Sequence, residues 1–292
     1  MSWFQDFQEI VQPSAPLAPH TWFKLGGPAE FFARPTSLDQ LIQLVRRCHD
    51  QSLAIRILGG GSNVLVRDQG VPGVVVRLDH PAFQEITVIR PHLRAGGGAA
   101  LGQVISAAVR AGLAGIEPLV GIPGSVGGAL HGNSGSHGTD VGQWTRRATV
   151  MTRAGDIIQH EGEDLVFSYR QSSLDALVIL EAEFVLEEDD PEQLTKRMQK
   201  QWIVKKASQP MAHQPAECVF KNHRGLSASS LVEQAGLKGM RIGGAEVCQQ
   251  DANFIIVQEG ATSDDVLRLI DHVRKEVADR LDVELELALD VW

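Results

Sequence analysis

The segment "ILGGGSNVLV" spans residues 57–66 and places three consecutive glycines between two apolar runs. Glycine weakens a strand, but it permits sharp turns and lets a ligand approach bare backbone amides. A second segment of this kind, "GIPGSVGG", spans residues 121–128. Turn amides suit anions, and short side chains such as Ser62, Asn63 and Ser125 add donors without bulk. The two loops together therefore predict a shared site for a nucleotide diphosphate, although each alone is also typical of an ordinary tight turn.

Neither loop fits the common phosphate-binding motifs. The Rossmann fingerprint requires a third glycine, but counting from Gly59 or Gly96 places Val64 or Leu101 at that position. A Walker A loop ends in Gly-Lys-Ser/Thr, and the chain contains no Gly-Lys pair. The sequence thus excludes a P-loop NTPase and gives no support for a Rossmann site.

The residues before the first glycine loop predict a strand, a helix and a second strand. The strands are expected over residues 29–35 and 53–59, and Ser37 with Gln40 forms a capping-box signature for the helix between them. The second strand runs into the glycines, as expected for a ligand site at the carboxyl end of a strand. Further helices are predicted over 100–112, 191–206, 227–237 and 263–281, and strands over 70–78, 145–152, 156–162, 175–186, 253–258 and 283–291.

The composition bounds the class of protein and its partners. The chain has 292 residues, of which 43% are apolar and 22% charged, as in ordinary globular proteins. A formal net charge of -9 argues against nucleic acid as a partner. The three cysteines form no CxxC pair and the histidines no HxxxH spacing, so we expect neither a disulfide framework nor a metal site. We find no signal peptide or membrane span and expect a cytoplasmic protein.

Six collinear segments resemble the UDP-N-acetylenolpyruvoylglucosamine reductases, the MurB family, in its shorter subclass. The resemblance covers nearly the whole chain and is far more specific than a single glycine motif. Its segments are "HTWFKLGGPAEFFARP" (20–35), "ILGGGSNVLV" (57–66), "GLAGIEPLVGIPGSVGGALHGNSGSHG" (112–138), "FSYRQSS" (167–173), "QPMAHQPAECVFKN" (209–222) and "AGLKGMRIGGAEV" (235–247).

The resemblance implies an α+β fold with a two-part FAD-binding region of the vanillyl-alcohol-oxidase (PCMH) type, followed by a smaller α/β substrate-binding domain. We expect the FAD-binding subdomains over residues 1–78 and 79–187 and the substrate-binding domain over 188–292. The family uses FAD, reduced by NADPH, to reduce UDP-N-acetylglucosamine enolpyruvate to UDP-N-acetylmuramate in peptidoglycan precursor synthesis. The implied partner is therefore a small UDP-sugar, and we expect a monomer without membrane insertion.

The resemblance also assigns site residues by position. Arg170 matches the family arginine that polarises the substrate carboxylate, and a guanidinium suits this task because it stays charged and binds two oxygens. Cys218 stands where most of the family carries the serine that donates the second proton. Lys206 and Asn222 resemble family positions near the UDP phosphates or the nicotinamide nucleotide, and both are candidate substrate-binding residues. Tyr169 is a third candidate because it stands next to Arg170, where it contacts the substrate or packs. The implied FAD-binding residues are Gly59, Gly60, Gly61, Ser62, Asn63, Gly121, Ile122, Pro123, Gly124, Ser125, Gly127 and Gly128.

The end of the chain departs from the family pattern. The family reads Leu-Glu-x-Glu-Val, whereas "LELAL" here places Glu286 at the first glutamate and Ala288 at the second, catalytic one. In a strand over 283–291, Glu284, Glu286, Ala288 and Asp290 share one face. Glu286 or Asp290 could thus supply the carboxylate, each displaced by about 6.6 Å along the strand, and Glu286 is the candidate catalytic residue.

Two alternative functions stay open at this point. One is an FAD-linked oxidase of the same superfamily, which returns electrons to oxygen. The other, suggested by Ala288, is a flavin and UDP-sugar binding protein with impaired catalysis.

Overall fold

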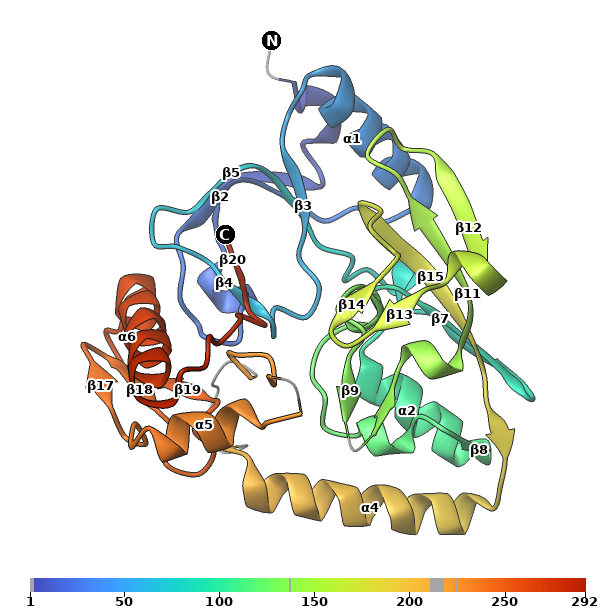
Figure 1. Ribbon diagram of the computed structural model, residues 1–292. Coiled ribbons are helices and arrows are strands. Elements are labelled where there is room, and N and C mark those ends of the chain that lie inside the picture. Colours follow the sequence, from blue (N-terminus) through green and yellow to red (C-terminus); the bar gives the residue numbers. More distant parts are fainter. Residues whose placement is uncertain (1–2, 137, 211–217, 224) are drawn as a thin grey trace. The chain divides into compact units, whose positions relative to one another are not determined.

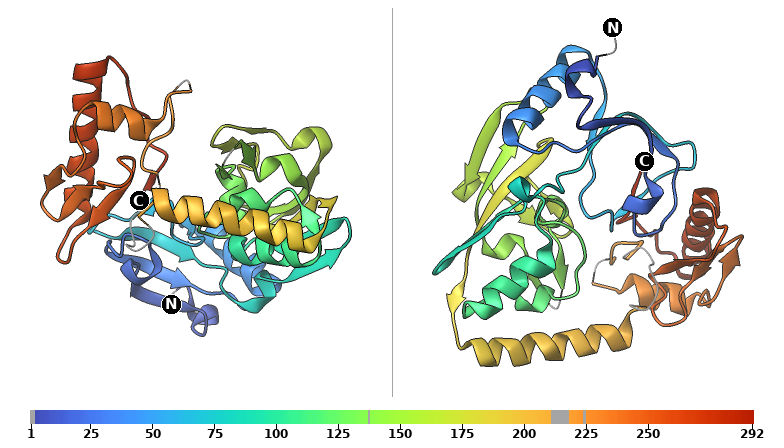
Figure 2. Two further views of the ribbon diagram at one scale, coloured as in Figure 1. Left: turned by 90° about the horizontal axis from the view of Figure 1, so that it is seen from below. Right: turned by 180° about the vertical axis from the view of Figure 1, so that it is seen from behind.

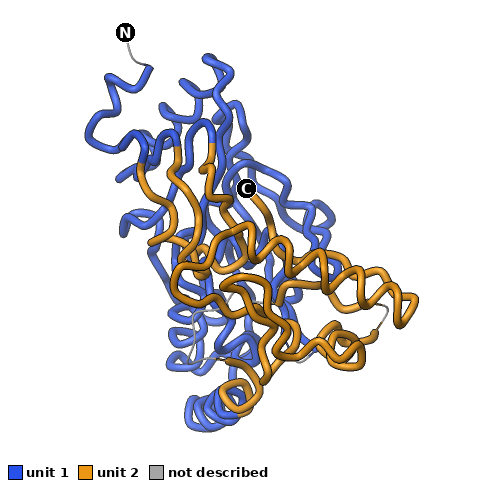
Figure 3. The backbone as a smooth tube through the Cα atoms, turned by 90° about the vertical axis from the view of Figure 1, so that its left-hand side faces the viewer, with its two compact units in different colours: residues 1–14, 30–60, 72–203 blue, residues 15–29, 61–71, 204–292 orange. Residues whose placement is uncertain are grey.

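The computed structural model describes residues 3–136, 138–210, 218–223 and 225–292 (Figure 1). The chain divides into two compact units, each built from segments distant in sequence (Figure 3). Unit 1 comprises Met1–Ser14, Glu30–Gly60 and Pro72–Ile203, and unit 2 comprises Ala15–Ala29, Gly61–Val71 and Val204–Trp292. The three-part division expected from the sequence follows other boundaries and stays a prediction.

A five-stranded antiparallel sheet forms the centre of unit 1. In order across the sheet it contains β12 (Ile157–Glu161), β11 (Thr145–Met151), β15 (Val178–Val185), β7 (His92–Gly96) and β6 (Ile86–Ile89). β11, β12 and β15 lie within or coincide with the strands predicted from the sequence. The sheet therefore combines β6 and β7, which precede the second glycine loop in the sequence, with β11, β12 and β15, which follow it.

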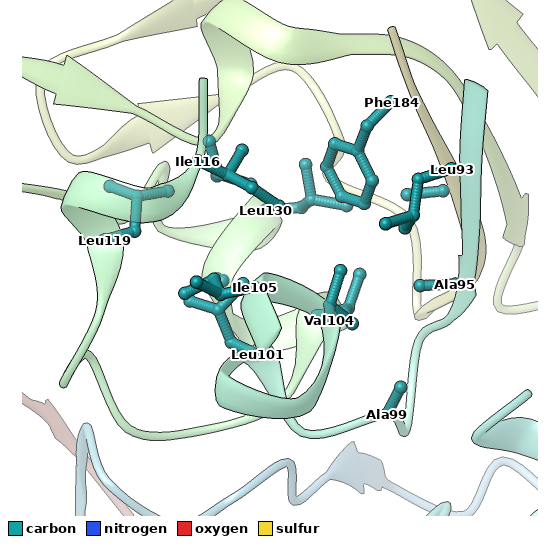
Figure 4. Close-up of a cluster of buried hydrophobic side chains, with 14 of the residues drawn as sticks. Leu93, Ala95, Ala99, Leu101, Val104, Ile105, Ile116, Leu119, Leu130 and Phe184 are labelled. Carbon is teal, nitrogen blue, oxygen red and sulfur yellow. The ribbon is translucent and has the colours of Figure 1, made fainter. Parts of the chain in front are cut away.

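Two helices cover the apolar core of this sheet. α2 (Leu101–Arg110) buries the five residues predicted to form its apolar face, Leu101, Val104, Ile105, Ala108 and Val109. α3 (Val126–His131) follows the second glycine loop and buries Val126, Ala129 and Leu130. Side chains from α2, α3, β7 and β15 meet in one cluster, shown in Figure 4. This packing fixes α3, and with it the loop that precedes it.

A second core in unit 1 lies under α1 (Leu38–Asp50). Its sheet has the order β1 (Val11–Pro16), β2 (Pro28–Ala33), β5 (Val71–Val76) and β3 (Ile55–Ile57). Ser37 caps α1 by accepting a hydrogen bond from the Gln40 amide at 3.3 Å, as predicted. The Gln40 side chain, however, accepts from the amide of Thr36 rather than that of Ser37, so the capping box is displaced by one residue.

The remaining elements of unit 1 are short, apart from one helix. They are the pairs β8 (Leu113–Ala114) with β16 (Glu187–Glu188), β9 (Gly135–Ser136) with β10 (Thr139–Asp140), and β13 (Phe167–Ser168) with β14 (Gln171–Ser172). The 3₁₀ turns are η1 (Gln5–Phe7), η3 (Pro81–Phe83), η4 (Glu117–Leu119), η5 (Gly142–Trp144) and η6 (Gly162–Asp164). The long helix α4 (Pro191–Ser208) begins in unit 1 and ends in unit 2.

Unit 2 packs two helices against a three-stranded antiparallel sheet. Its elements are η2 (Ala18–His20), α5 (Ala228–Gln234), β17 (Arg241–Ile242), β18 (Ala245–Val247), β19 (Ile255–Val257) and α6 (Ser263–Leu281). Figure 2 shows α6, in red, beside these strands from two further sides. Thr262 and Asp265 cap α6 reciprocally. Hydrogen bonds from the amides of Gly244 and Thr262 hold the pKa of the Asp265 carboxyl below its usual value.

The C-terminal strand is shorter than the sequence predicts. Instead of a strand over 283–291, the structure has β20 (Asp290–Val291), parallel to β4 (Val64–Leu65), and an isolated bridge between Phe220 and Leu287. The predicted alternation of faces is nevertheless correct. Leu285 and Leu289 are buried in the core of unit 2, whereas Glu284 and Glu286 are exposed. The strand prediction was wrong in extent because, in the described part of the chain, the segment pairs with other backbone at β4 and at Phe220 alone.

None of the helices in the part of the chain that the structure describes combines the length and the apolar character needed to span a bilayer.

Candidate active site

The two glycine loops meet inside unit 1. A Cβ atom built on Gly60 would lie 2.5 Å from the Cα of Gly124, so the backbones are in direct contact. A Cβ on Gly59 would lie 2.7 Å from the Ser125 hydroxyl. Separations this short leave no room for a side chain on Gly60. The convergence predicted from two segments about sixty residues apart is therefore present.

The amides at this junction suit an anion. Within the described residues, no acceptor pairs with the N–H groups of Gly59, Gly60 or Gly124. Unpaired backbone donors that are clustered and bare of side chains form the concavities that bind phosphate groups. The junction thus fits the diphosphate of FAD, the cofactor expected from the sequence, with these three residues as its donors.

Other residues of the second loop hold the loop rather than offer donors. The amides of Val126 and Gly127 donate to the carbonyls of Ala99 and Gly97, at 2.9 and 2.8 Å. The Gly128 amide donates to the Ser125 hydroxyl. The first turn of α3 therefore has no free amide at Val126, Gly127 or Gly128. Of the remaining predicted residues, Gly121 has a φ of +82° and Ile122 packs against the core, beside Pro123.

A hairpin in the same unit presents Arg170. Strands β13 and β14 pair Ser168 with Gln171, which leaves Tyr169 and Arg170 as a two-residue turn. Arg170 is half-buried with a φ of +57°, in the left-handed region that non-glycine residues rarely adopt. Such strained residues persist where the surrounding structure holds them, and they gather at functional sites. Tyr169 is 56% exposed. The unusual backbone conformation of Arg170 is therefore a second indication of a functional role, independent of its sequence motif.

The rest of the first glycine loop belongs to unit 2. Gly61 has a φ of +70°, and a Cβ there would lie 2.1 Å from the His20 carbonyl oxygen. Ser62 is buried. The Asn63 side chain donates to the Ala288 carbonyl at 2.9 Å. This loop is thereby joined to the C-terminal segment in which the family glutamate is missing.

Cys218 begins a segment that runs antiparallel to that C-terminal segment. The Ala288 amide donates to the Val219 carbonyl at 2.9 Å, and the Lys221 amide donates to the Glu286 carbonyl at 2.8 Å. Cys218 is half-buried. By contrast, burial raises the pKa of the Cys48 thiol to about 11, so Cys48 is an inert core residue. Of these two cysteines, Cys218 is the one that lies beside the candidate site residues.

Glu286 is exposed and paired. Its carboxylate lies 3.5 Å from the Lys221 ammonium, and its side chain is 74% exposed. Opposed residues of antiparallel segments point to one face, so Lys221 and Glu286 share a face. The alternation places Ala288 on that face also, as predicted. Ala288, at the position of the family's second glutamate, therefore lies on the same face as the Lys221–Glu286 ion pair.

Two predicted substrate-binding residues differ in setting. Asn222 accepts a hydrogen bond from the Ala228 amide at 3.0 Å and so supports the start of α5. Lys206 is exposed on α4, whereas Lys205 is only 5% exposed. Successive helical residues point about 100° apart. Lys205 is therefore the buried lysine of this pair, and Lys206 points to another side of α4. In the described chain, no hydrogen bond or ion pair connects Lys206 to the other candidate residues.

Sequence reasoning missed the residue that holds the Cys218 segment. Asn253 is 4% exposed, and its side chain both accepts from the Phe220 amide and donates to the Phe220 carbonyl, each at 2.9 Å. Its own carbonyl accepts from the Val219 amide. A buried amide with both ends used in this way fixes a backbone segment. The only sequence signal was an asparagine next to an apolar run.

Comparisons with known proteins identify the family of the chain. Residues 209–292 match the C-terminal domain of UDP-N-acetylenolpyruvoylglucosamine reductase, and residues 29–160 match an FAD binding domain. The reductase of Heliobacterium modesticaldum is 40% identical over 97% of this chain and 90% of its own length. That of Rhodopirellula baltica is 36% identical over 99% and 94%.

The solved structure of the same reductase (MurB) from Thermus caldophilus is 32% identical, with a TM-score of 0.82 over 97% of this chain and 98% of that one. The chain belongs to the UDP-N-acetylenolpyruvoylglucosamine reductase family. The predicted family, its α+β fold with a PCMH-type FAD-binding region, its FAD cofactor with NADPH as reductant and its class as a flavin oxidoreductase are thus confirmed. The superfamily oxidase and the impaired binding protein are not favoured.

Replacing Gly60 by alanine tests the loop junction. The added methyl group would force the Gly124 backbone away. Hydrogen bonds to charged groups contribute about 1.5–3 kcal/mol, so losing one should raise the Kd for FAD roughly 10- to 100-fold. We expect this rise in a flavin titration of the apoprotein. Gly102→Ala, on α2 where a Cβ meets nothing within 4 Å, serves as control. Equal FAD affinity in both variants would contradict the assignment.

Proposed function

We propose that this protein reduces UDP-N-acetylglucosamine enolpyruvate to UDP-N-acetylmuramate, with NADPH as reductant. The observation that carries the proposal is the union, within unit 1, of the glycine junction and the Arg170 hairpin, both attached to α3. Bound FAD supplies the transfer of hydride from NADPH to the vinyl carbon of the substrate. The chain itself holds the cofactor, binds the substrate carboxylate and delivers a proton to the neighbouring carbon.

Arg170 stabilises charge that develops during the reaction. Addition of hydride to an enol ether conjugated with a carboxylate moves negative charge onto that carboxylate. A guanidinium binds two carboxylate oxygens at once and cannot lose its proton at neutral pH. A fixed cation acts most strongly where it is already oriented before charge develops. The left-handed turn that holds Arg170 supports this role, because it fixes the residue at the hairpin tip.

Cys218 donates the proton in this proposal. The thiol is more acidic than the hydroxyl that most of the family carries there, so it can protonate a carbanion and regain its proton from water. Lys221, three residues after Cys218, forms an ion pair with Glu286 on the C-terminal segment. We assign Glu286 the auxiliary acid role, with Tyr169, Asn222 and Lys206 as contacts to the UDP-sugar. The protein is further proposed to act as a cytoplasmic monomer without nucleic acid partners.

The purified protein tests the proposal directly. We expect a yellow protein with the visible spectrum of bound FAD and NADPH oxidation that depends on UDP-N-acetylglucosamine enolpyruvate. Nicotinamide absorbance follows the turnover. NADPH oxidation that proceeds equally without the UDP-sugar, with oxygen as acceptor, would contradict the reductase function.

Replacing Arg170 by glycine separates function from stability. Glycine adopts a positive φ without the cost of about 1–2 kcal/mol that other residues bear. Its own entropy cost of about 0.5–1 kcal/mol offsets part of that gain. We therefore expect the unfolding free energy to stay level or rise by up to about 1.5 kcal/mol. Loss of one fixed donor to developing charge should lower kcat on the order of 100- to 1000-fold.

Urea unfolding and steady-state kinetics measure the two effects. The matched control is Ser52→Gly, which replaces an exposed residue with a φ of +53° just beyond α1. It should show the same stability gain with unchanged kcat. If Arg170→Gly retained full activity, the arginine would have no part in catalysis.

Replacing Cys218 by alanine should stall only the second half of the reaction. We expect flavin reduction by NADPH to stay within about twofold of the unmodified protein. Product formation should fall on the order of 100-fold or more, because general acid catalysis contributes factors of this size. Stopped-flow absorbance of the flavin follows both steps. Cys218→Ser, which restores the family hydroxyl, should keep most of the activity. Equal losses in both steps would remove Cys218 from the proton-donor role.

A further inference from the structure

Asn133 ends α3 in a well-defined turn. The helix is followed by Gly132 and then by Asn133, which has a φ of +40°. The Asn133 amide donates to the Leu130 carbonyl at 3.2 Å, and the Ser134 amide donates to the Ala129 carbonyl at 2.7 Å. These two bonds define a Schellman motif, in which the left-handed position is usually glycine. The turn alone therefore does not account for an asparagine.

The Asn133 side chain links this turn to the hairpin of Arg170. Asn133 is 3% exposed. Its amide group donates to the Ser168 carbonyl at 2.9 Å, and its side-chain oxygen accepts from the Gly142 amide at 3.0 Å. Ser168 is the residue that enters the two-residue turn. The backbone at the base of the Arg170 turn is thus held by a buried side chain with both ends bonded.

Two further contacts attach the same hairpin. The Ser172 hydroxyl donates to the His131 carbonyl at 3.0 Å, at the last residue of α3. A Cβ built on Gly142 would lie 2.3 Å from the Phe167 ring, so β13 packs directly on η5. Because Asn133 bonds to both Gly142 and Ser168, it stands where the helix, η5 and the hairpin join. The other end of α3 begins at Ser125, at the glycine junction.

We propose that Asn133 is a positioning residue that sets the place of the Arg170 guanidinium relative to the cofactor loops. The inference rests on the proposed role of Arg170. Displacement of a charged group by about 1 Å can cost on the order of 100-fold in rate. Losing the bond to Ser168 frees the hairpin at its base, whereas the glycine junction at the opposite end of α3 keeps its own contacts. The expected defect is therefore confined to the step that uses the substrate carboxylate.

The experiment uses the FAD-loaded protein with two substitutions of different kind. Asn133→Asp keeps the acceptor for Gly142 and loses the donor to Ser168, and Asn133→Gly keeps the left-handed turn and loses both bonds. For each we expect flavin reduction by NADPH within about twofold and flavin reoxidation by UDP-N-acetylglucosamine enolpyruvate slowed roughly 10- to 100-fold. Ile105→Val, a mild change in the core of the same unit, controls for lost stability.

A double-mutant cycle decides whether Asn133 acts through Arg170. In an Arg170→Ala background, Asn133→Asp should slow reoxidation by no more than about twofold, because the group it positions is gone. Additive losses, or slowing of both half-reactions together with loss of FAD, would overturn the inference and leave Asn133 a structural residue. If Arg170→Ala itself left reoxidation unchanged, the proposed role of Arg170 would fail first. The two failures are therefore distinguishable.

Discussion

The contact between the backbones of Gly60 and Gly124 is the constraint on which the rest of unit 1 depends. It requires a residue without a side chain at position 60, and within residues 3–136, 138–210, 218–223 and 225–292 the neighbouring amides of Gly59, Gly60 and Gly124 have no protein acceptor. It also fixes where α3 begins, since Ser125 is the N-cap of that helix. The far end of α3 carries the bonds to the Arg170 hairpin. One close approach thus relates the proposed FAD-binding amides to the proposed catalytic residue Arg170.

This arrangement explains why the familiar phosphate motifs fail on the sequence. Rossmann and P-loop proteins place phosphate groups at the N-terminus of a helix, where free amides and the helix dipole act together. Here the first-turn amides of Val126, Gly127 and Gly128 are bonded inside the fold. The donors proposed for the cofactor phosphates come instead from irregular loops. Motifs that require a strand, glycines and a helix at fixed spacing therefore do not match this sequence. The physical requirement for unpaired backbone amides is nevertheless the same.

The sequence predicts local structure well and buried polar support poorly. The apolar spacing of α2 and α6 identifies these helices because a helix face needs only its own residues. The strand expected over 283–291 shows the correct alternation, yet it has few backbone partners, which no local pattern encodes. Asn133 stands in a polar stretch typical of an exposed loop, and Asn253 stands at the start of an apolar run. Their burial depends on distant carbonyl groups, so only the fold reveals that they hold the two candidate catalytic segments.

The departures from the family pattern in unit 2 are chemically consistent with one another. The backbone of Ala288 is fixed on both sides, by its bond to the Val219 carbonyl and by the Asn63 side chain. The backbone conformation at position 288 therefore does not depend on a carboxylate side chain. A hydroxyl donor needs a neighbouring acid or base to release its proton readily, whereas a thiol is acidic enough to need less assistance. In the proposed mechanism, a cysteine at position 218 thus needs less help from a carboxylate at position 288 than a serine would, which is consistent with the alanine found there.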